Sequence, residues 1–354
     1  MRKIILGAVA LLVMMTPGMA LAFDVVEGFS ISGFVDVSYY NNAKAETSTF
    51  SLDEGEVDII KTIQDAGGLR LDINTRTVDR MVSVSASAGE TISVEGLSDV
   101  AMEQGFVWID LPSDFKFTFG KFNAPIGFEL VDPNQMYQYS HAMVFTYGLP
   151  TNLTGAMLSG AFGMVDVSVY AVNGWDKIQD DNKDKTIGGR LGVTPAEGVN
   201  VGFSYITGKE GPVSDGISPS NLSVFDVDAT LTMIEGLTVG AEYNMGTHEG
   251  QSLVTAGDDA TWSGYLVMAN YAVTDKVGLT LRYDAFDDKE GARLGAGKQQ
   301  LSSFTVSPSY AIGDGFGALA EYRYTKSDEK VFASADGTLE DNVSEFAVEF
   351  TYSF

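Results

Sequence analysis

The segment Leu237-Thr-Val-Gly-Ala-Glu-Tyr-Asn-Met245 decides how the chain folds, because its side chains alternate strictly between apolar and polar. Strict alternation over such a length predicts a β-strand with one apolar and one polar face. The same period of two recurs near 67–76, 276–286 and 344–354. The sequence therefore predicts an all-β protein.

The period of two marks about sixteen strands, most of them 8 to 12 residues long. We predict strands at 28–41, 67–76, 80–88, 103–111, 114–121, 152–160, 163–172, 187–194, 199–207, 223–232, 236–245, 262–273, 276–286, 302–312, 316–325 and 344–354. A tilted strand crosses a bilayer in roughly 9–11 residues, whereas strands of soluble sandwiches most often have about 5–6. The lengths favour a membrane barrel over a soluble sandwich or propeller.

The predicted connections alternate between long and short. The long ones are 42–66, 89–102, 122–151, 173–186, 208–222, 246–261, 287–301 and 326–343. Outer-membrane barrels have this rhythm of short periplasmic turns and longer outer loops. The sequence therefore predicts a transmembrane antiparallel β-barrel of about 16 strands, and an even strand count places both termini in the periplasm.

The polar faces of the predicted strands carry many charged residues. We assign to the lumen wall Asp36, Arg70, Asp72, Arg76, Lys116, Arg190, Glu242, Arg282, Asp284, Glu321 and Arg323. A Lys or Arg facing lipid at mid-depth costs roughly 2–4 kcal/mol, so these residues need water. A barrel of about sixteen strands is wide enough for an aqueous channel. Whether single wall residues set selectivity or only keep the lumen wet is left open.

The segment from Gly120 to Pro150 has no period of its own and follows the fifth predicted strand. A loop of about 30 residues is usually functional or disordered, and disordered segments are poor in aromatics. Because this one is rich in Phe and Tyr, we expect it to fold into the lumen. Its charged residues predict a constriction site of Lys121, Glu129, Asp132 and His141. The alternative is that Glu129 only anchors the loop by hydrogen bonds.

Two motifs resemble a known family. Gly120-Lys-Phe-Asn-Ala-Pro-Ile-Gly-Phe-Glu129, with Tyr139-Ser140, Pro150 and Thr154-Gly155 at their spacing, is similar to the hallmark of the OmpL-like putative β-barrel porin-2 family. The later Val172-Asn-Gly-Trp-Asp176 also resembles that family. The resemblance implies a diffusion channel in the outer membrane of a Gram-negative cell.

The first residues have the composition of an export signal. Arg2 and Lys3 precede an apolar run, and Ala20-Leu-Ala22 offers small residues for cleavage. The apolar run is shorter than the roughly 20 residues of a membrane-spanning helix. The sequence therefore predicts a signal peptide at 1–22, cleaved before Phe23, and a single barrel domain at 23–354.

The net charge indicates which partners the chain has. Removal of Arg2 and Lys3 changes the formal net charge from −26 to −28, which excludes nucleic acid as a natural partner. We place most of the acidic excess in outer loops, the first of which holds Glu46, Asp53, Glu54, Glu56 and Asp58. Carboxylates at a pore favour cations, so we expect a mildly cation-preferring channel. Wall arginines gathered at the constriction would reverse this preference.

Catalytic and metal sites lack support. The chain has no Cys, and its histidines are His141 and His248; Ser140 and His141 are adjacent and point apart in extended chain, so no catalytic triad is indicated. Asp180-x-Asn182-x-Asp184 begins like a calcium loop, but Lys185 and Leu191 occupy the positions that require Gly and Glu. We therefore expect neither an enzyme nor a cofactor or metal.

The most direct function is a porin for passive diffusion of small hydrophilic solutes and ions. Its partners are then outer-membrane lipid and the solutes themselves, and the sequence leaves a homo-oligomer open. The alternative function is a barrel that serves as an adhesin or structural scaffold through its outer loops.

Overall fold

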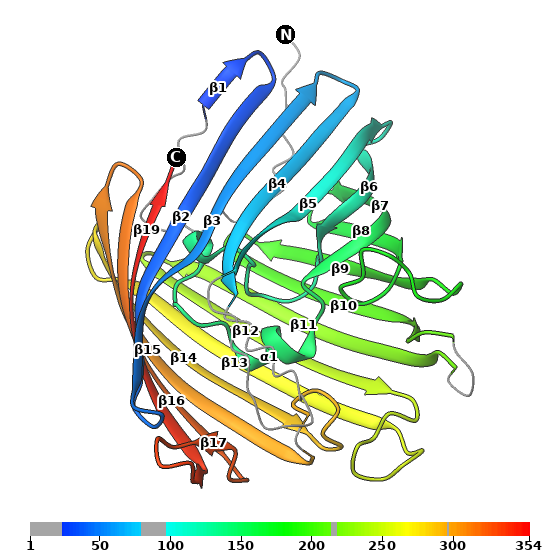
Figure 1. Ribbon diagram of the computed structural model, residues 1–354. Helices are drawn as coiled ribbons and strands as arrows, with labels where there is room; N and C mark the ends of the chain where they lie inside the picture. Colours follow the sequence, from blue (N-terminus) through cyan, green and yellow to red (C-terminus); the bar gives the residue numbers. More distant parts are fainter. Residues whose placement is uncertain (1–22, 79–96, 214–217, 296) are drawn as a thin grey trace.

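Strands make up most of the chain, as the period of two predicts. The computed structural model describes residues 23–78, 97–213, 218–295 and 297–354. Sixteen strands of these ranges follow one another around a barrel (Figure 1): β2 (Phe29–Asn42), β3 (Thr47–Ile63), β4 (Gly67–Val78), β5 (Leu97–Leu111), β6 (Phe115–Asn123), β7 (Asn152–Phe162), β8 (Val165–Val172), β9 (Thr186–Ala196), β10 (Val199–Glu210), β11 (Ser220–Ile234), β12 (Leu237–His248), β13 (Ala260–Ala272), β14 (Val277–Asp288), β15 (Gln299–Gly313), β16 (Phe316–Ser327) and β19 (Asn342–Ser353).

Each barrel strand pairs antiparallel with the next strand along the chain. The ring closes where β19 pairs with β2, with Phe350 opposite Val37. Closure pairs the backbone groups of every strand on both sides, which hydrocarbon surroundings require. The short β1 (Phe23–Val26) pairs with β2 beside the ring, and β17 (Phe332–Ala333) and β18 (Leu339–Glu340) form a small hairpin. The predicted antiparallel barrel of about sixteen strands is confirmed.

The helical elements of the described ranges are short and adjacent in sequence. Both η1 (Pro133–Gln135) and α1 (Met143–Gly148) belong to the connection between β6 and β7. Within the ranges given above, no helix combines the length and apolar character needed to cross a membrane. Figure 1 shows α1 and the strand-free chain around it inside the ring of strands. The predicted loop after the fifth barrel strand therefore folds into the lumen.

One predicted connection is wrong. The range 42–66 contains β3, so the chain between β2 and β3 is only the turn 43–46. The side chains of Glu54, Glu56 and Asp58 therefore lie on a strand rather than in an outer loop. Charged side chains are tolerated there because they alternate with Gly55 and Val57 and face the lumen. The strand predicted at 80–88 lies outside the described residues.

The two ends of the barrel differ in their connections. Turns of two to four residues join β3 to β4, β5 to β6 and the later strand pairs at one end, and the C-terminus lies at that end (Figure 1). Several of these turns have a glycine at positive φ, for example Gly198 at 74° and Gly236 at 75°, where side chains are unfavourable. The connections at the other end are longer from β6 onward, which agrees with the predicted rhythm.

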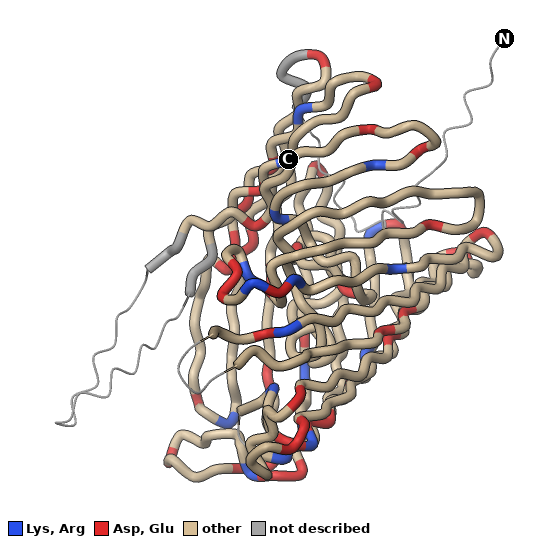
Figure 2. The backbone as a smooth tube through the Cα atoms, turned by 90° about the vertical axis from the view of Figure 1, so that its right-hand side faces the viewer, with Lys and Arg blue, Asp and Glu red and all other residues tan. Residues whose placement is uncertain are grey.

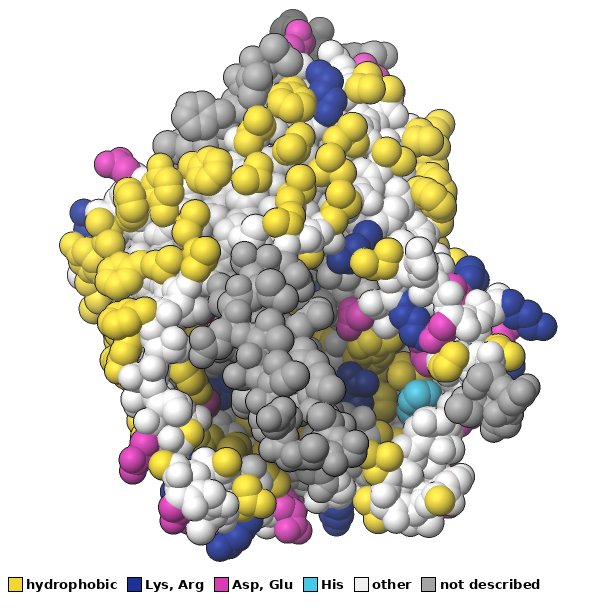
Figure 3. Space-filling view, in the orientation of Figure 1, with side chains coloured by type: hydrophobic (Ala, Val, Ile, Leu, Met, Phe, Trp, Pro, Cys, Tyr) yellow, Lys and Arg dark blue, Asp and Glu magenta, His cyan; other side chains and the backbone are white. Residues whose placement is uncertain are grey.

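The two faces of the barrel wall differ as lipid and lumen require. Apolar side chains such as Phe350 and Val169 point outward and are 51% and 58% exposed in the isolated chain. Figure 3 shows hydrophobic side chains spread over the strands of the face in view. Charged residues occur at intervals along the strands as well as in the connections (Figure 2). Inner-wall residues such as Glu349 and Asp226 are almost fully buried, so the lumen is partly filled.

Candidate functional site

The connection 124–151 crosses the lumen, and we refer to it below as the lumen loop. The backbone N–H of Ala124 donates to the carbonyl oxygen of Thr151 at 2.8 Å. The side-chain amide of Asn152 donates to that of Asn123 at 2.6 Å. The loop therefore begins and ends at one point on the wall.

Three carboxylates of the inner wall bind the backbone of the lumen loop. Glu242 accepts a hydrogen bond from the backbone N–H of Phe128 at 2.6 Å. Asp284 accepts one from Met143 at 3.0 Å, and Glu321 accepts one from Ser140 at 3.2 Å. Hydrogen bonds to an ionised acceptor are stronger than neutral ones. Because the carboxylates belong to β12, β14 and β16, the loop is fixed along a broad part of the wall.

Close approach of the loop to the wall requires glycine at one position. Gly127 has a φ of 87°, and a Cβ added there would lie 2.7 Å from Leu149 Cδ1 and 3.1 Å from Glu242 Oε2. The chain can therefore pass Glu242 only without a side chain at this residue, which allows the next N–H to reach the carboxylate.

Arg282 is the centre of the contact between loop and wall. Its Nη1 lies 2.9 Å from Glu129 Oε1, and its Nε lies 3.2 Å from Asp284 Oδ1. The guanidinium also donates to the carbonyl oxygen of Ser140 at 2.5 Å and to its Oγ at 3.0 Å. Glu129 in turn accepts the N–H of Ala142 at 2.7 Å. Since the Arg282 side chain is 0% exposed, its charge depends on these carboxylates for compensation.

His141 lies beside this centre and contacts the loop itself. Its Nε2 is 2.8 Å from the carbonyl oxygen of Leu130, and its ring stacks on Phe145 with centroids 4.2 Å apart. Arg323 donates to the His141 carbonyl oxygen at 3.1 Å and lies 3.5 Å from Asp284. The His141 ring thus stabilises the loop conformation, and its backbone extends the anchor to β16.

Apolar residues of the loop and of the inner wall form a dry cluster. The buried members are Phe122, Ile126, Met143, Leu149, Leu153, Tyr170, Val172, Ile206, Leu222, Val224, Trp262, Phe286 and Leu301. The sequence analysis assigned inward positions only to polar residues, so it missed this sector. Adjacent apolar pairs, such as Val224-Phe225 and Tyr205-Ile206, were the available signal, because they place apolar side chains on both faces of one strand.

Arg293 closes the cluster from another connection. Its guanidinium carbon lies 4.4 Å from the ring centroid of Trp175 and 5.2 Å from that of Trp262. Its Nε donates to the carbonyl oxygen of Tyr147 at 2.6 Å. Cation–π contacts of this kind contribute about 0.5–2 kcal/mol each, so Arg293 joins three connections at the lumen loop.

Lys121 lies on β6 beside the lumen loop, not within it. It stands opposite Gly105 and Thr154 and shares the parity of the outward Phe119. Its Nζ donates to the carbonyl oxygen of Met102 at 2.8 Å. The described contacts therefore tie Lys121 to β5.

Asp132 faces another part of the lumen from Glu129. Its Oδ2 accepts the side-chain amide of Gln135 at 2.6 Å, and the residue is 8% exposed. Burial, followed by the charges of Glu103 and Asp58, raises the pKa of Asp132 well above its usual range. The lumen loop thus carries a buried carboxyl toward the acidic wall of β3 and β5.

Two predicted wall arginines pair with neighbours on the wall. Arg70 Nε lies 2.8 Å from Asp72 Oδ1, and its Nη2 lies 3.3 Å from Asp58 Oδ1. Arg190 binds Asp228 through both terminal nitrogens, one of them at 2.8 Å. Both arginines therefore sit beside carboxylates of their own wall sector.

The remaining predicted wall residues have separate surroundings. Asp36 is buried on the inner face of β2. Lys116 is exposed near the turn between β5 and β6, with its Nζ 5.2 Å from the ring centroid of Trp108. The backbone of Arg76 stands opposite Glu54, and its side chain lies outside what the structure describes.

The sequence analysis also missed three glutamates that meet on the inner wall. Glu54 and Glu56 are adjacent inward positions of β3, and Glu103 occupies the extra position of a β-bulge in β5 between Met102 and Gln104. Alternation of Glu54, Glu56 and Asp58 with apolar and glycine residues was a signal for the strand. The bulge that turns Glu103 inward has no comparable sequence signal.

Comparisons with known proteins agree with this geometry. The family described as "Putative beta-barrel porin-2, OmpL-like" matches residues 28–354. No curated protein sequence matches the chain. The match covers the ring of strands and the lumen loop.

Solved structures share the fold at low sequence identity. OmpF of Salmonella typhi, in complex with daunomycin, has a TM-score of 0.65 at 13% identity over 93% of this chain and 98% of its own. The trimer form of OmpT of Vibrio cholerae has a TM-score of 0.63 at 15% sequence identity, over 92% of this chain and 99% of its own. An anion-selective porin from Comamonas acidovorans has a TM-score of 0.62 at 10% sequence identity, over 92% of this chain and 99% of its own.

Proposed function

Because the chain belongs to the OmpL-like putative β-barrel porin-2 family, it is a porin-like outer-membrane channel, and we propose that small hydrophilic solutes and ions cross its lumen by passive diffusion. Members of a porin family are channels rather than enzymes, which confirms the expectation that the chain is not an enzyme. Export by a signal peptide cleaved before Phe23 is part of the proposal, and residues 1–22 lie outside the described residues.

The charge of the inner wall carries the proposed preference for cations. The four wall arginines whose side chains are described all form ion pairs: Arg70, Arg190, Arg282 and Arg323. Each is therefore balanced by a carboxylate, so these arginines leave no unpaired positive charge on the described wall. Acidic side chains favour cations in channels, and a wall whose arginines are balanced in this way supports a mild cation preference.

Conduction is tested by reconstituting the protein in a planar lipid bilayer. We expect stepwise increases of current as single channels insert, because a closed barrel of this strand number has room for water beside the loop. Membranes treated with detergent alone serve as the control. Silent membranes with correctly folded protein would favour the adhesin or scaffold function.

The sign of the selectivity is tested by reversal potentials across a KCl gradient. We expect potassium to be the more permeant ion, and we expect the preference to weaken with salt, because screening lengths fall from about 10 Å at 0.1 M to about 3 Å at 1 M. The fold itself does not determine the sign, since one barrel of this shape is an anion-selective porin. Chloride as the more permeant ion would contradict the proposal.

We also propose a homo-oligomer. OmpT of Vibrio cholerae, which shares the fold, has a trimer form. Apolar side chains on the outer wall of this chain can contact either lipid or a second copy.

A further inference from the structure

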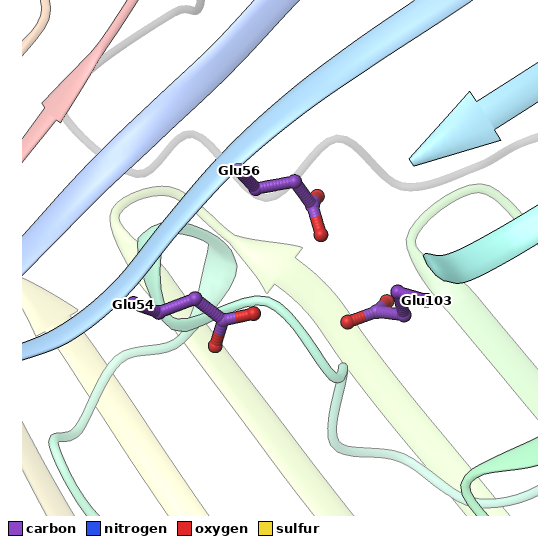
Figure 4. A group of neighbouring side chains, drawn as sticks. All are labelled: Glu54, Glu56 and Glu103. Carbon is purple, nitrogen blue, oxygen red and sulfur yellow. The ribbon is translucent and has the colours of Figure 1, made fainter. Parts of the chain in front are cut away.

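An acidic cluster lies on the inner wall where β3 and β5 face the lumen. Glu54, Glu56 and Glu103 each place one carboxylate oxygen within 4.8 Å of the others. Figure 4 shows the three side chains pointing toward one another from β3 and β5. In a second group, made of Glu56, Asp58 and Asp72, one carboxylate oxygen of each residue also lies within 4.8 Å of the others. Glu56 is therefore shared by two groups of carboxylates.

Glu56 has no polar partner among the described residues. It is 2% exposed, and neither of its carboxylate oxygens has a hydrogen-bond partner there. Glu54 and Glu103 do have a polar partner, because the side-chain amide of Asn74 donates to Glu54 at 2.8 Å and to Glu103 at 3.1 Å. A buried carboxylate without a partner is costly, so the position of Glu56 calls for a cation between these side chains.

Asp132 brings a further carboxyl to this region from a different segment of the chain. It is 8% exposed, and its Oδ1 has no hydrogen-bond partner in the described part of the chain. Burial and the charges of Glu103 and Asp58 raise the pKa of Asp132, and Arg70 acts in the opposite direction. A second buried carboxyl without a full set of partners thus belongs to the same acidic region.

The basic residues nearby form their ion pairs with other carboxylates. Arg70 pairs with Asp58 and Asp72. Arg76 stands opposite Glu54 in the β3–β4 register. No ion pair within 4.0 Å joins Glu56 or Asp132 to a basic side chain of the described ranges. Glu56 and Asp132 are therefore the carboxyls of this region that pair with no described basic side chain.

We propose that Glu54, Glu56 and Glu103 bind a divalent cation on the inner wall of the barrel. Oxygen ligands lie about 2.3–2.6 Å from Ca²⁺, so two ligands of one ion are at most about 5 Å apart. The carboxylate oxygens of the cluster lie within 4.8 Å of one another, so a single Ca²⁺ can contact all three. Mg²⁺ needs shorter distances and keeps most of its water, so the assignment is Ca²⁺. The bound ion joins β3 to β5 on the inner wall, because its ligands come from both strands.

Calorimetric titration of the full-length, folded protein in detergent with CaCl₂, after removal of divalent ions by a chelator, tests the site. We expect saturable binding in the parent protein and a Kd at least about tenfold higher in Glu56→Gln, because calcium affinity depends on the number of ligand charges. Asp226→Asn is the matched control, since Asp226 is also a buried inner-wall carboxylate and forms no ion pair in the described residues, but it lies on β11. Its Kd should equal that of the parent.

Equal affinity of Glu56→Gln and the parent would overturn the site, and so would the absence of saturable binding. MgCl₂ binding as tightly as CaCl₂ would overturn the assignment to Ca²⁺. If Glu56→Gln fails to fold, Glu54→Gln carries the same test at a second ligand of the site, with a higher Kd expected. Calorimetry detects the ion whether or not the barrel conducts, so failure here leaves the proposed diffusion function standing.

Discussion

Replacement of Arg282 by methionine is expected to release the lumen loop from the barrel wall. Methionine keeps much of the apolar stem but removes the donors to Glu129, Asp284 and Ser140. Removal of one partner from a buried ion pair costs about 3–5 kcal/mol. Glu129 retains the Ala142 N–H, so we expect the lower end, about 3 kcal/mol.

Release of the loop can be measured with a single introduced cysteine, because the chain has none of its own. Ala142 is 0% exposed, so Ala142→Cys places a thiol that is protected while the loop is docked. A loss of about 3 kcal/mol in docking corresponds to roughly a hundredfold increase in the open fraction. We therefore expect labelling of this thiol in folded Arg282→Met to be faster by about that factor.

Arg190→Met is the matched control for this experiment. Arg190 forms a two-nitrogen ion pair with Asp228 on the wall, and no described contact joins it to the lumen loop. Its replacement removes a comparable ion pair while leaving the introduced thiol protected. If labelling is equally slow in Arg282→Met, the backbone bonds to wall carboxylates hold the loop without the arginine.

The barrel could be predicted because lipid and lumen impose opposite demands on the two faces of each strand. The segment predicted at 236–245 is β12, and its Glu242 faces inward as its parity requires. A one-residue shift of such a strand would turn its charged residues to the lipid. The period of two therefore identifies each strand, and its inward face, independently of the other strands.

The strand β3 could have been predicted from the same period, but its acidic composition resembled an outer loop. Glu54 and Glu56 alternate with Gly55 and Val57, which is the pattern used elsewhere in the chain. The bulge at Asp53, where the β2–β3 register shifts, interrupts the period at the start of this run. Composition was therefore the weaker guide where period and composition disagreed.

The contacts of the lumen loop could not be predicted, because they depend on how a segment without a period folds. Charge sign alone cannot distinguish among the wall arginines Arg70, Arg76, Arg190, Arg282 and Arg323 as partners for Glu129 and Asp132. The structure pairs Glu129 with Arg282, while Asp132 faces carboxylates. Only the path of the loop, set by its closed base and by η1 and α1, distinguishes these partners.

The dry sector of the lumen is a consequence of the same loop. A wall that faced only water would need polar side chains at every inward position, but β8, β10, β11 and β14 carry apolar ones there. Those side chains and the loop aromatics bury one another. The lumen is thus divided into an apolar sector under the loop and a charged sector, which contains the acidic cluster of β3 and β5.

Truncation of Phe286 to alanine is expected to loosen the loop through this apolar sector. Phe286 is 1% exposed on the inner face of β14, and its ring centroid lies 5.7 Å from that of Tyr147 in α1. Loss of a buried Phe side chain costs about 3–5 kcal/mol. Because the neighbouring side chains of the loop can relax into part of the space, we expect the lower end, about 3 kcal/mol.

Thermal unfolding in detergent measures the effect of Phe286→Ala, and labelling of the thiol introduced by Ala142→Cys locates it. Phe350→Ala is the matched control, since Phe350 points outward on β19 and is 51% exposed in the isolated chain. Lipid or detergent can occupy the space that Phe350 leaves, so this variant should lower the unfolding temperature less and leave the thiol protected. An equal loss of stability in both variants, with the thiol protected in both, would mean that the aromatic ring stabilises the strand alone. Faster labelling in Phe286→Ala only would mean that the loop is held by apolar packing as well as by Arg282.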